Sequence, residues 1–422
     1  MYDYSLCPNN TVFCLDLVSF FASVSCVKLG YDPLQTKLAV VSDTTRPGSV
    51  VLAATKPLKK LGINQGSRLY ELASIPDVLV VNPQMDTYIR CSNYISQIIL
   101  QYVPAEYYFQ YSIDECFIQI DNILHLFADN PREFAMKLQR EIYTKTKGIS
   151  ASIGIGKNML MAKIALDVEA KHNPDLIAEW DYSDVPTKLW SIRPLSKFWG
   201  ISTKTEAKLN RKGIRTIGDL AHYPLNYLQQ EFGVIGTDLH LHSHGIDFSR
   251  ITDTYKPKST SIGKSQILMR DYELAEIPVI LLEHIEEVCY RMRMKHKLAR
   301  TVQFSIGYSR SYGGGFRKSV TFERPTCMTM DIYHICLKYL MQLHTGEPIR
   351  SISISLTNLV SEGEEQISIF DDIKKREQQI KLTRALDEIR TRFGRNSILR
   401  AISYTPHSTI KYRNTLVGGH KA

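Results

Sequence analysis

The sequence predicts a multi-domain protein of the α+β class. Its 422 residues suggest two to four domains, at about 100 to 200 residues each. Up to Trp180, strand-like and helix-like segments are mixed in an order that favours an α/β or α+β core. Residues 251–260 (ITDTYKPKST) are polar, contain a proline and lack periodicity, as linkers do. A second α+β domain is therefore expected after this linker, at residues 261–360.

The opening segment predicts a strand, a short turn and a helix. Residues 11–18 (TVFCLDLV) are a nearly continuous apolar run, as in a central strand that is covered on both faces. The run contains one charge, Asp16, and Ser19 then stands at the N-cap position of a helix that closes on Gly30. This arrangement places a carboxylate at a strand end beside the free backbone amides of a helix start, which bind phosphate without a glycine-rich loop.

Apolar runs, periodicity and turn residues predict the remaining elements. We expect strands at 38–42 and 50–54, a helix at 86–103, two β-rich pieces (YYFQY and CFIQI) joined by SIDE, a helix at 131–145, a strand at ISASIGIG and a helix at NMLMAKIALDVEAK. After a shift in composition at Trp180, residues 196–220 indicate a helix, a glycine turn and a helix. The later domain has strand candidates at TVQFSIGYS, SVTFE and IRSISISLTNL, and the charged tail has one amphipathic helix near Ile373–Phe393.

Composition narrows the class of protein. With 44% apolar and 23% charged residues, collagen-like, disordered and disulfide-scaffold classes are excluded. The net charge of +9 makes a polyanion such as nucleic acid the first partner to consider. The eight cysteines lack C-x-x-C pairs and zinc spacing, so reduced thiols are expected. No apolar run reaches the ~20 residues of a membrane span and no secretory signal is visible, which predicts a cytoplasmic protein without a membrane partner.

Three carboxylates are candidates for a metal site. Asp114 and Glu115 are adjacent, and neighbouring side chains of a regular strand point to opposite faces, so both can face one site only if the chain turns at SIDE. Together with Asp16 they would repel each other and have raised pKa values unless a divalent cation such as Mg²⁺ binds between them. Two such ions, about 3.5–4 Å apart, clamp a phosphoryl transfer. By itself, an Asp–Glu pair at a hairpin tip is also typical of a solvated turn.

Two segments predict contacts with DNA phosphates. Residues 198–220 match a helix-hairpin-helix pattern, whose glycine turns present backbone amides to phosphate; a plain helical hairpin is the alternative. The stretch 291–300 (RMRMKHKLAR) holds five Lys or Arg residues, for which a solvated helix face is the alternative. The candidate contacts are Gly200, Ser202, Gly213, Arg291, Arg293 and Lys295.

Three weaker signals complete the sequence. Lys59 and Lys171 could add point charges for a phosphate, although a lone lysine is usually solvated. The alternating histidines of DLHLHSH (238–244) place His240 and His244 on one helix face, where ordinary packing is favoured over a metal site. QISIF (366–370) follows the acidic, flexible stretch SEGEE and carries two large apolar anchors, as a peptide that docks in a pocket does.

Together these pieces resemble the Y-family DNA polymerases, the translesion enzymes, and most closely the UmuC-like branch of Gram-positive bacteria. The resemblance covers about Thr11 to Asp371. It is carried by D-x-x-x-F-[FY]-A-S-V (16–24), Y-S-I-D-E (111–115), S-I-G-I-G-K-N followed by A-K-I-A (152–165), the hairpin pattern, and QISIF. The order and spacing of these motifs match the family.

The resemblance implies a right-hand architecture. Palm would comprise 9–30 and 86–180, small fingers 31–85, a helical thumb with the helix-hairpin-helix 181–250, the linker 251–260, the little finger 261–360, and a tail with the clamp-binding motif 361–422.

The same resemblance implies roles for individual residues. Two Mg²⁺ ions would be held by Asp16, Asp114, Glu115 and the Leu17 carbonyl. The triphosphate would be bound by the backbone amides of Phe20 and Phe21 and by Lys59 and Lys171, and Phe21 would be the steric gate that excludes a ribose 2′-OH. The sliding-clamp peptide would be Gln366, Ile367, Ser368, Ile369 and Phe370. This sequence departs from the family at Lys56, Met159, Ser25 and Phe21, outside the carboxylates.

The implied activity is error-prone, template-directed addition of deoxynucleotides to a DNA 3′ end opposite damaged template, in an SOS-type damage response. Primer-template DNA, deoxynucleoside triphosphates and the bacterial sliding clamp would be the partners of a monomeric, nucleoid-associated protein. No separate exonuclease carboxylate set is visible, so proofreading is not expected. Two other readings exist: a non-catalytic DNA- and clamp-binding scaffold, which need not keep the three carboxylates, and a palm-type nucleotide cyclase, which predicts neither hairpin nor clamp peptide.

Overall fold

The computed structural model describes residues 2–253, 257, 259–363 and 373–421. It divides into two compact units, Met1–Thr254 together with His420–Ala422, and Tyr255–Gly419. The division falls inside the linker that was predicted at residues 251–260. Across the described ranges, no helix combines the length and the apolar character needed to cross a membrane.

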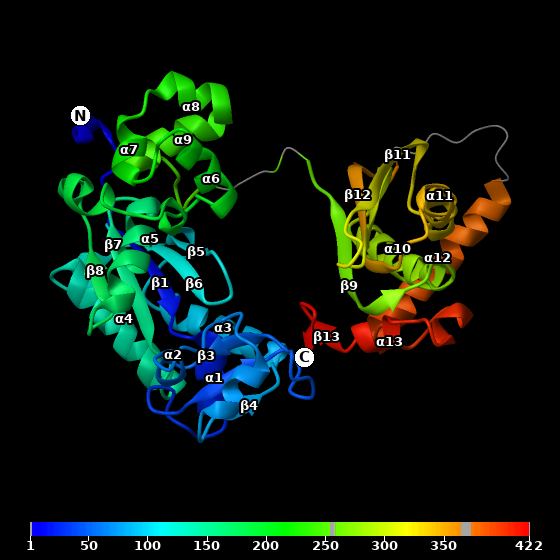
Figure 1. Ribbon diagram of the computed structural model, residues 1–422, viewed down its shortest axis with the longest axis horizontal. Coiled ribbons are helices and arrows are strands. Elements are labelled where there is room, and N and C mark those ends of the chain that lie inside the picture. Colours follow the sequence, from blue (N-terminus) through cyan, green and yellow to red (C-terminus); the bar gives the residue numbers. More distant parts are fainter. Residues whose placement is uncertain (1, 254–256, 258, 364–372, 422) are drawn as a thin grey trace. The chain divides into compact units, whose positions relative to one another are not determined.

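A five-stranded sheet forms the centre of the first unit (Figure 1). Its order is β5 (Tyr108–Gln110), β6 (Glu115–Gln119), β1 (Val12–Leu17), β7 (Ala151–Gly156) and β8 (Ile177–Glu179). Strand β1 pairs antiparallel with β6 and with β7, whereas β7 and β8 run parallel. The apolar run at 11–18 is therefore the central strand that the sequence predicted.

Three helices cover this sheet. They are α3 (Met85–Ile99), α4 (Pro131–Thr146) and α5 (Met159–Val168). Because side chains alternate along a strand, Phe13 and Leu15 of β1 pack into the cluster with α3 and α4, whereas Val12 and Cys14 pack into the cluster with α5. Strand β1 is buried on both faces for this reason.

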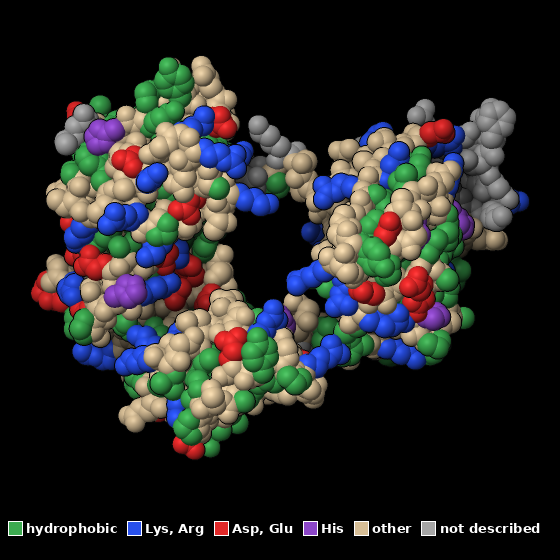
Figure 2. Space-filling view, in the orientation of Figure 1, with side chains coloured by type: hydrophobic (Ala, Val, Ile, Leu, Met, Phe, Trp, Pro, Cys, Tyr) green, Lys and Arg blue, Asp and Glu red, His purple; other side chains and the backbone are tan. Residues whose placement is uncertain are grey.

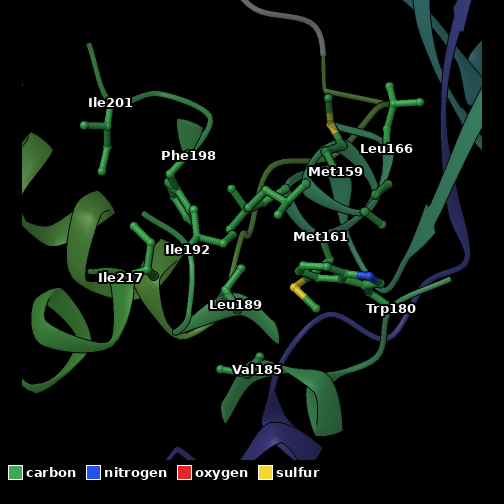
Figure 3. Close-up of a cluster of buried hydrophobic side chains, with 14 of the residues drawn as sticks. Met159, Met161, Leu166, Trp180, Val185, Leu189, Ile192, Phe198, Ile201 and Ile217 are labelled. Atoms are coloured by element: carbon green, nitrogen blue, oxygen red, sulfur yellow. The ribbon is translucent and has the colours of Figure 1, made fainter. Parts of the chain in front are cut away.

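Helix α5 lies against β7 at a distance that requires glycine. A Cβ atom added at Gly154 would lie 2.2 Å from the Ala162 carbonyl oxygen, and one added at Gly156 would lie 2.3 Å from the Ala162 nitrogen. On another side of α5, Met159 and Met161 join the apolar cluster of Trp180 and the segment that follows it (Figure 3). Helix α5 is thus held between the sheet and the helical region, and the polar side chains that it carries have defined positions.

A smaller sheet follows α1 (Phe20–Lys28) in the chain. Its order is β3 (Val51–Ala54), β2 (Leu38–Val41) and β4 (Leu79–Val81), and the short helix α2 (Lys56–Lys59) comes directly after β3. Ala22 and Cys26 of α1 pack against Leu38 and Val40 of β2. Strands β2 and β3 lie where the sequence predicted them, whereas β4, with three residues, was not predicted.

Helices make up the region between residues 200 and 245. They are α6 (Thr203–Arg211), α7 (Ile217–His222), α8 (Leu225–Phe232) and α9 (Val234–Ser243). The first two confirm the predicted helix, glycine turn and helix. Their apolar side chains, Leu209, Ile217 and Leu220, belong to the same cluster as α5, which joins this region to the central sheet.

The second unit is a four-stranded antiparallel sheet covered by helices (Figure 1). The strand order is β11 (Gly315–Thr326), β10 (Lys297–Tyr308), β12 (Ile349–Ser361) and β9 (Ile262–Tyr272), and α10 (Ile277–Arg293) and α11 (Thr329–Leu343) share its apolar core. Strands β10, β11 and β12 confirm the three strand candidates. Strand β9 was missed because its pattern is mostly polar: it is an edge strand with only Ile262, Leu268 and Tyr272 buried.

The C-terminal part of the chain is packed on α10 rather than free. Helix α12 (Ile373–Phe393) has the predicted bounds, and Arg390 at 3.1 Å from Glu286 holds it to α10. Further along, Ser408 and Thr409 bond to the buried Glu283. The division at Gly419 accordingly places most of the predicted tail in the same unit as the four-stranded sheet.

Arg293 corrects the prediction for the basic stretch 291–300. Helix α10 ends at Arg293, whose side chain is buried. Its guanidinium donates to both carboxylate oxygens of Asp387 at 2.6 and 3.0 Å and to the Cys327 carbonyl at 2.9 Å. The prediction that Arg293 contacts DNA is wrong, because its guanidinium is buried and bonded to groups within the second unit. Arg291 and Lys295 are exposed, as their prediction requires.

Candidate active site

The three predicted carboxylates meet at one end of β1 and β6. Asp16 and Glu115 are register partners on these neighbouring strands, and the Leu17 N–H donates to the Asp114 carbonyl at 2.9 Å. The chain does turn at SIDE: the N–H groups of Tyr111 and Ser112 both donate to the Glu115 carbonyl at 2.9 Å. With Glu115 only 8% exposed, the alternative of a solvated hairpin tip does not hold.

A chain of ion pairs joins the two strand carboxylates through α5 and the 3₁₀ turn that follows it. Lys163 Nζ lies 2.7 Å from Glu115 Oε1 and 3.0 Å from Asp167 Oδ2. Lys171 Nζ lies 2.8 Å from Asp167 Oδ1 and 3.2 Å from Asp16 Oδ2. Charges therefore alternate from Glu115 to Asp16, and each lysine serves two carboxylates.

The sequence analysis missed Lys163, and also Asp167, with which Lys163 pairs. Lys163 stands in the A-K-I-A motif on a helix whose other residues are almost all apolar and buried, and a lone lysine there was the available signal. Burial alone would lower its pKa, but the neighbouring Cys14, Glu115 and Asp167 outweigh burial and raise the pKa above its usual value. Cys14 also donates its S–H to Glu115 Oε1 at 3.1 Å. One oxygen of Glu115 thus has two partners.

The surroundings of Asp16 disfavour the charged form of its carboxylate. Burial raises the pKa of Asp16 to about 6, Lys171 opposes the shift, and Asp114 and Glu115 add to it. The carboxylate closest to the helix start is therefore costly to ionise in this arrangement. A bound cation would remove that cost.

The donor set fits a hard divalent cation such as Mg²⁺. All three side chains offer carboxylate oxygens, which Mg²⁺ prefers, and Asp114 and Glu115 lie near enough to Asp16 to raise its pKa. Among the described residues, no group of three or more His, Cys, Asp or Glu stands together in metal-binding geometry. Lys163 and Lys171 supply positive charge to Glu115 and Asp16.

The start of α1 adjoins the carboxylates. Ser19 is at the N-cap, as predicted, but it does not cap: its φ of 50° is left-handed and its side chain makes no cap hydrogen bond. Phe20 is buried in the core, so only its backbone can face a ligand. Lys59, at the end of α2, interacts electrostatically with both Asp16 and Lys171. Burial and the charge of Lys171 lower the pKa of Lys59, and Asp16 only partly opposes this shift. Lys59 and Lys171 therefore lie on the same side as the carboxylates.

Phe21 has a defined orientation. Its ring stacks on Tyr88 of α3, with centroids 4.4 Å apart and planes 11° apart. Tyr88 is 1% exposed, and its hydroxyl shares a 2.9 Å hydrogen bond with Ser25. The Phe21 ring thus rests on a buried, hydrogen-bonded support.

The helix-hairpin-helix presents the predicted backbone groups. Gly200 and Gly213 have φ of +91° and +83°, and a Cβ on either would meet no atom within 4 Å, so both turns are open. Ser202 caps α6 by accepting the Thr205 N–H at 3.2 Å. Lys and Arg side chains are spread over both units, with acidic groups among them (Figure 2). The DNA contacts of these residues stay predictions.

Two other predicted features have simple outcomes. His240 of α9 and His244, the C-cap of that helix, lie side by side with ring centroids 4.8 Å apart, and Tyr2 packs on both rings. Burial lowers the pKa of both. The clamp peptide, residues 366–370, lies outside the described residues.

Comparison with known proteins identifies the family. Family models match three parts of the chain: the impB/mucB/samB family at residues 15–167, the thumb domain of DNA polymerase-iota at 198–247, and the impB/mucB/samB C-terminal domain at 259–369. A Bacillus subtilis protein described as "Putative UV-damage repair protein UvrX" is 45% identical over the full length of both chains. The chain belongs to the Y family of DNA polymerases.

Other Y-family members match over nearly the whole chain. "DNA polymerase IV 2" of Bacillus subtilis is 34% identical over 98% of this chain and 99% of its own length, and "DNA polymerase IV 2" of Halalkalibacterium halodurans is 33% identical over 98% and 99%. The structure of a Y-family polymerase chimera, "Dbh-Dpo4(243-245)-Dbh", covers 83% of this chain with a TM-score of 0.65 at 21% identity. The predicted right-hand fold with a helix-hairpin-helix thumb is confirmed.

Proposed function

We propose that this Y-family chain is a DNA-directed DNA polymerase that extends primers across damaged template in an SOS-type response. The observation that carries the proposal is that backbone pairing places Asp16, Asp114 and Glu115 side by side at the end of β1 and β6. The relatives support it, since they are described as DNA polymerase IV and as a UV-damage repair protein along the whole chain.

Two Mg²⁺ ions are the proposed cofactor, held by the three carboxylates and the Leu17 carbonyl. When bound, such ions lower the pKa of the primer 3′-OH and neutralise the departing pyrophosphate. The protein's part is to hold the ligands in place, which the ladder of β1 and β6 and the turn at Tyr111 and Ser112 do.

The incoming deoxynucleotide is held from the side of α1. The backbone amides of Phe20 and Phe21 bind the triphosphate at the helix start. Lys59 and Lys171 supply point charges, and Lys171 already faces Asp16 at 3.2 Å. The Phe21 ring is held on Tyr88. Its proposed role is the steric gate that excludes a ribose 2′-OH.

The remaining contacts serve the DNA and its delivery. Gly200, Ser202 and Gly213 contact the phosphate backbone from the open turns of the hairpin, and Arg291 and Lys295 do so from the second unit. The proposed fingers contain a small sheet of three strands. Their proposed role is to press weakly on the nascent pair, which admits damaged bases at the cost of accuracy. We further propose that the protein acts as a monomer and that residues 366–370 tether it to the sliding clamp. Its proposed location is the cytoplasm, in association with the nucleoid.

Primer extension by the purified protein tests this function. Wild-type protein extends primers over undamaged and ultraviolet-damaged templates with Mg²⁺ and fails without it. Asp114→Ala abolishes extension and keeps DNA affinity, because the basic surfaces are unchanged. Asp175→Ala, which removes an exposed carboxylate paired with Arg132, is the matched control and keeps activity. Extension by Asp114→Ala near the wild-type rate would contradict the carboxylate assignment, and a wild type that binds DNA without extending it would favour the scaffold.

A further inference from the structure

We propose that Trp199 and Tyr111 are positioning residues that couple DNA binding at the hairpin to the turn that carries Asp114 and Glu115. This inference rests on the proposed polymerase function. Trp199 immediately precedes Gly200, whose open backbone is the first turn of the hairpin. Its indole Nε1 donates a hydrogen bond to the Tyr111 hydroxyl at 3.2 Å. The residue beside the phosphate-binding turn is therefore bonded to the Y-S-I-D-E motif.

Aromatic packing reinforces this hydrogen bond. The Tyr111 and Trp199 rings meet edge to face, with centroids 5.8 Å apart. Both rings also lie on Phe117, at 5.6 Å from Tyr111 and 5.9 Å from Trp199. Phe117 is fully buried and stands on β6, two residues after Glu115. The contact thus has a rigid base on the strand that carries a catalytic carboxylate.

Tyr111 reaches the carboxylates through its own backbone. Its N–H donates to the Glu115 carbonyl at 2.9 Å, and that bond helps to close the turn around Asp114. A shift of Trp199 when the hairpin engages a phosphate is therefore passed to the Tyr111 side chain and from its backbone to the turn. Such contiguous contacts carry coupling between two sites, and the coupling is reciprocal: nucleotide and metal bound at the turn tighten DNA binding by the same factor.

Reciprocity gives a direct measurement. A primer ending in a dideoxynucleotide cannot be extended, so the DNA dissociation constant can be measured with and without Mg²⁺ and the correct deoxynucleoside triphosphate. Wild type, Tyr111→Phe, Trp199→Phe and the double variant are compared. Both substitutions remove the hydrogen bond and keep a ring. Tyr107→Phe is the matched control, because in the described contacts the Tyr107 hydroxyl bonds only to Asn122, which donates to it at 3.0 Å.

The expected result is specific. In wild type the nucleotide tightens DNA binding. In each single variant the nucleotide tightens DNA binding about fivefold less than in wild type. This corresponds to a loss of about 1 kcal/mol of coupling free energy, at about 1.4 kcal/mol per tenfold. The double variant loses no more than either single one, since the same bond is removed. The DNA affinity without nucleotide and the melting temperature stay within error of wild type, and Tyr107→Phe behaves as wild type.

Four outcomes would overturn the inference. Additive losses in the double variant would mean that the two side chains act separately. If the variants bind DNA more weakly than wild type without nucleotide, the rings would act as a stacking surface for DNA. Tyr111 is 45% exposed and could be reached in this way. If the variants have a lower melting temperature but nucleotide tightens their DNA binding as in wild type, the two residues serve only packing. Equal tightening of DNA binding in wild type, both single variants and the double variant would likewise exclude coupling. Extension of an ordinary primer by wild type is measured in parallel. If wild type fails to extend it, the proposed polymerase function is refuted. If wild type extends it, the DNA affinities with and without nucleotide test the coupling by itself.

Discussion

The buried ion pair of Lys163 allows a quantitative prediction. The Lys163 side chain is 9% exposed and lies between Glu115 and Asp167. Lys163→Met keeps the volume of the side chain and removes its charge, so Glu115 is left buried with the Cys14 thiol as its described partner. Removing one member of a buried ion pair costs about 3–5 kcal/mol, because the other charge remains desolvated. At about 2–4 °C per kcal/mol for a unit of this size, the melting temperature of the first unit should fall by roughly 6 °C or more.

Thermal unfolding followed by circular dichroism measures this effect, with and without Mg²⁺. Mg²⁺ should restore more stability to Lys163→Met than it adds to wild type, because a cation at the carboxylates replaces the missing lysine charge. Lys188→Met is the matched control: Lys188 also serves two carboxylates, Glu169 and Asp184, but its side chain is 39% exposed. Exposed pairs contribute about 0–1 kcal/mol. A loss for Lys163→Met as small as that for Lys188→Met would refute the reasoning.

Three further predictions concern other parts of the chain. Phe21→Ala should raise ribonucleotide incorporation severalfold while deoxynucleotide use is largely kept, measured by competing single-nucleotide insertions; unchanged selectivity would place the gate elsewhere. Ile369→Ala with Phe370→Ala should weaken sliding-clamp binding by about a hundredfold or more, at ~2 kcal/mol per anchor, with clamp-free extension intact; a joint loss of melting temperature and clamp-free activity would instead make these residues core. His284 is fully buried, which holds its pKa well below the usual value, so the unfolded chain binds one more proton below about pH 6.5. The second unit should therefore lose about 1.4 kcal/mol per pH unit on acidification below that point, and His284→Gln should flatten the slope by one proton.

The sequence by itself determined the central strand, the carboxylates and the hairpin. An apolar run such as 11–18 has few alternatives to a strand buried on both faces, and Asp16 is its one charge. Two β-rich segments joined by SIDE require a turn, which lets Asp114 and Glu115 face one site. Glycines spaced between helical patterns predict open turns. Each of these features depends on residues close together in the chain, where local geometry decides. The pairing of Asp16 with Glu115 across β1 and β6 was decided by the tertiary structure.

Tertiary structure alone decided which charges are paired. Arg291, Arg293 and Lys295 have the same sequence environment, yet Arg293 is buried against Asp387, 94 positions further on, while the other two are exposed. Lys163 likewise stands on a helix that pattern alone assigns to the core, and its role follows from β6 bringing Glu115 within 2.7 Å. An ion pair depends on two side chains meeting in space, and periodicity describes only the face on which each one lies. The function of a charged residue is therefore settled by its partner, and folding supplies the partner.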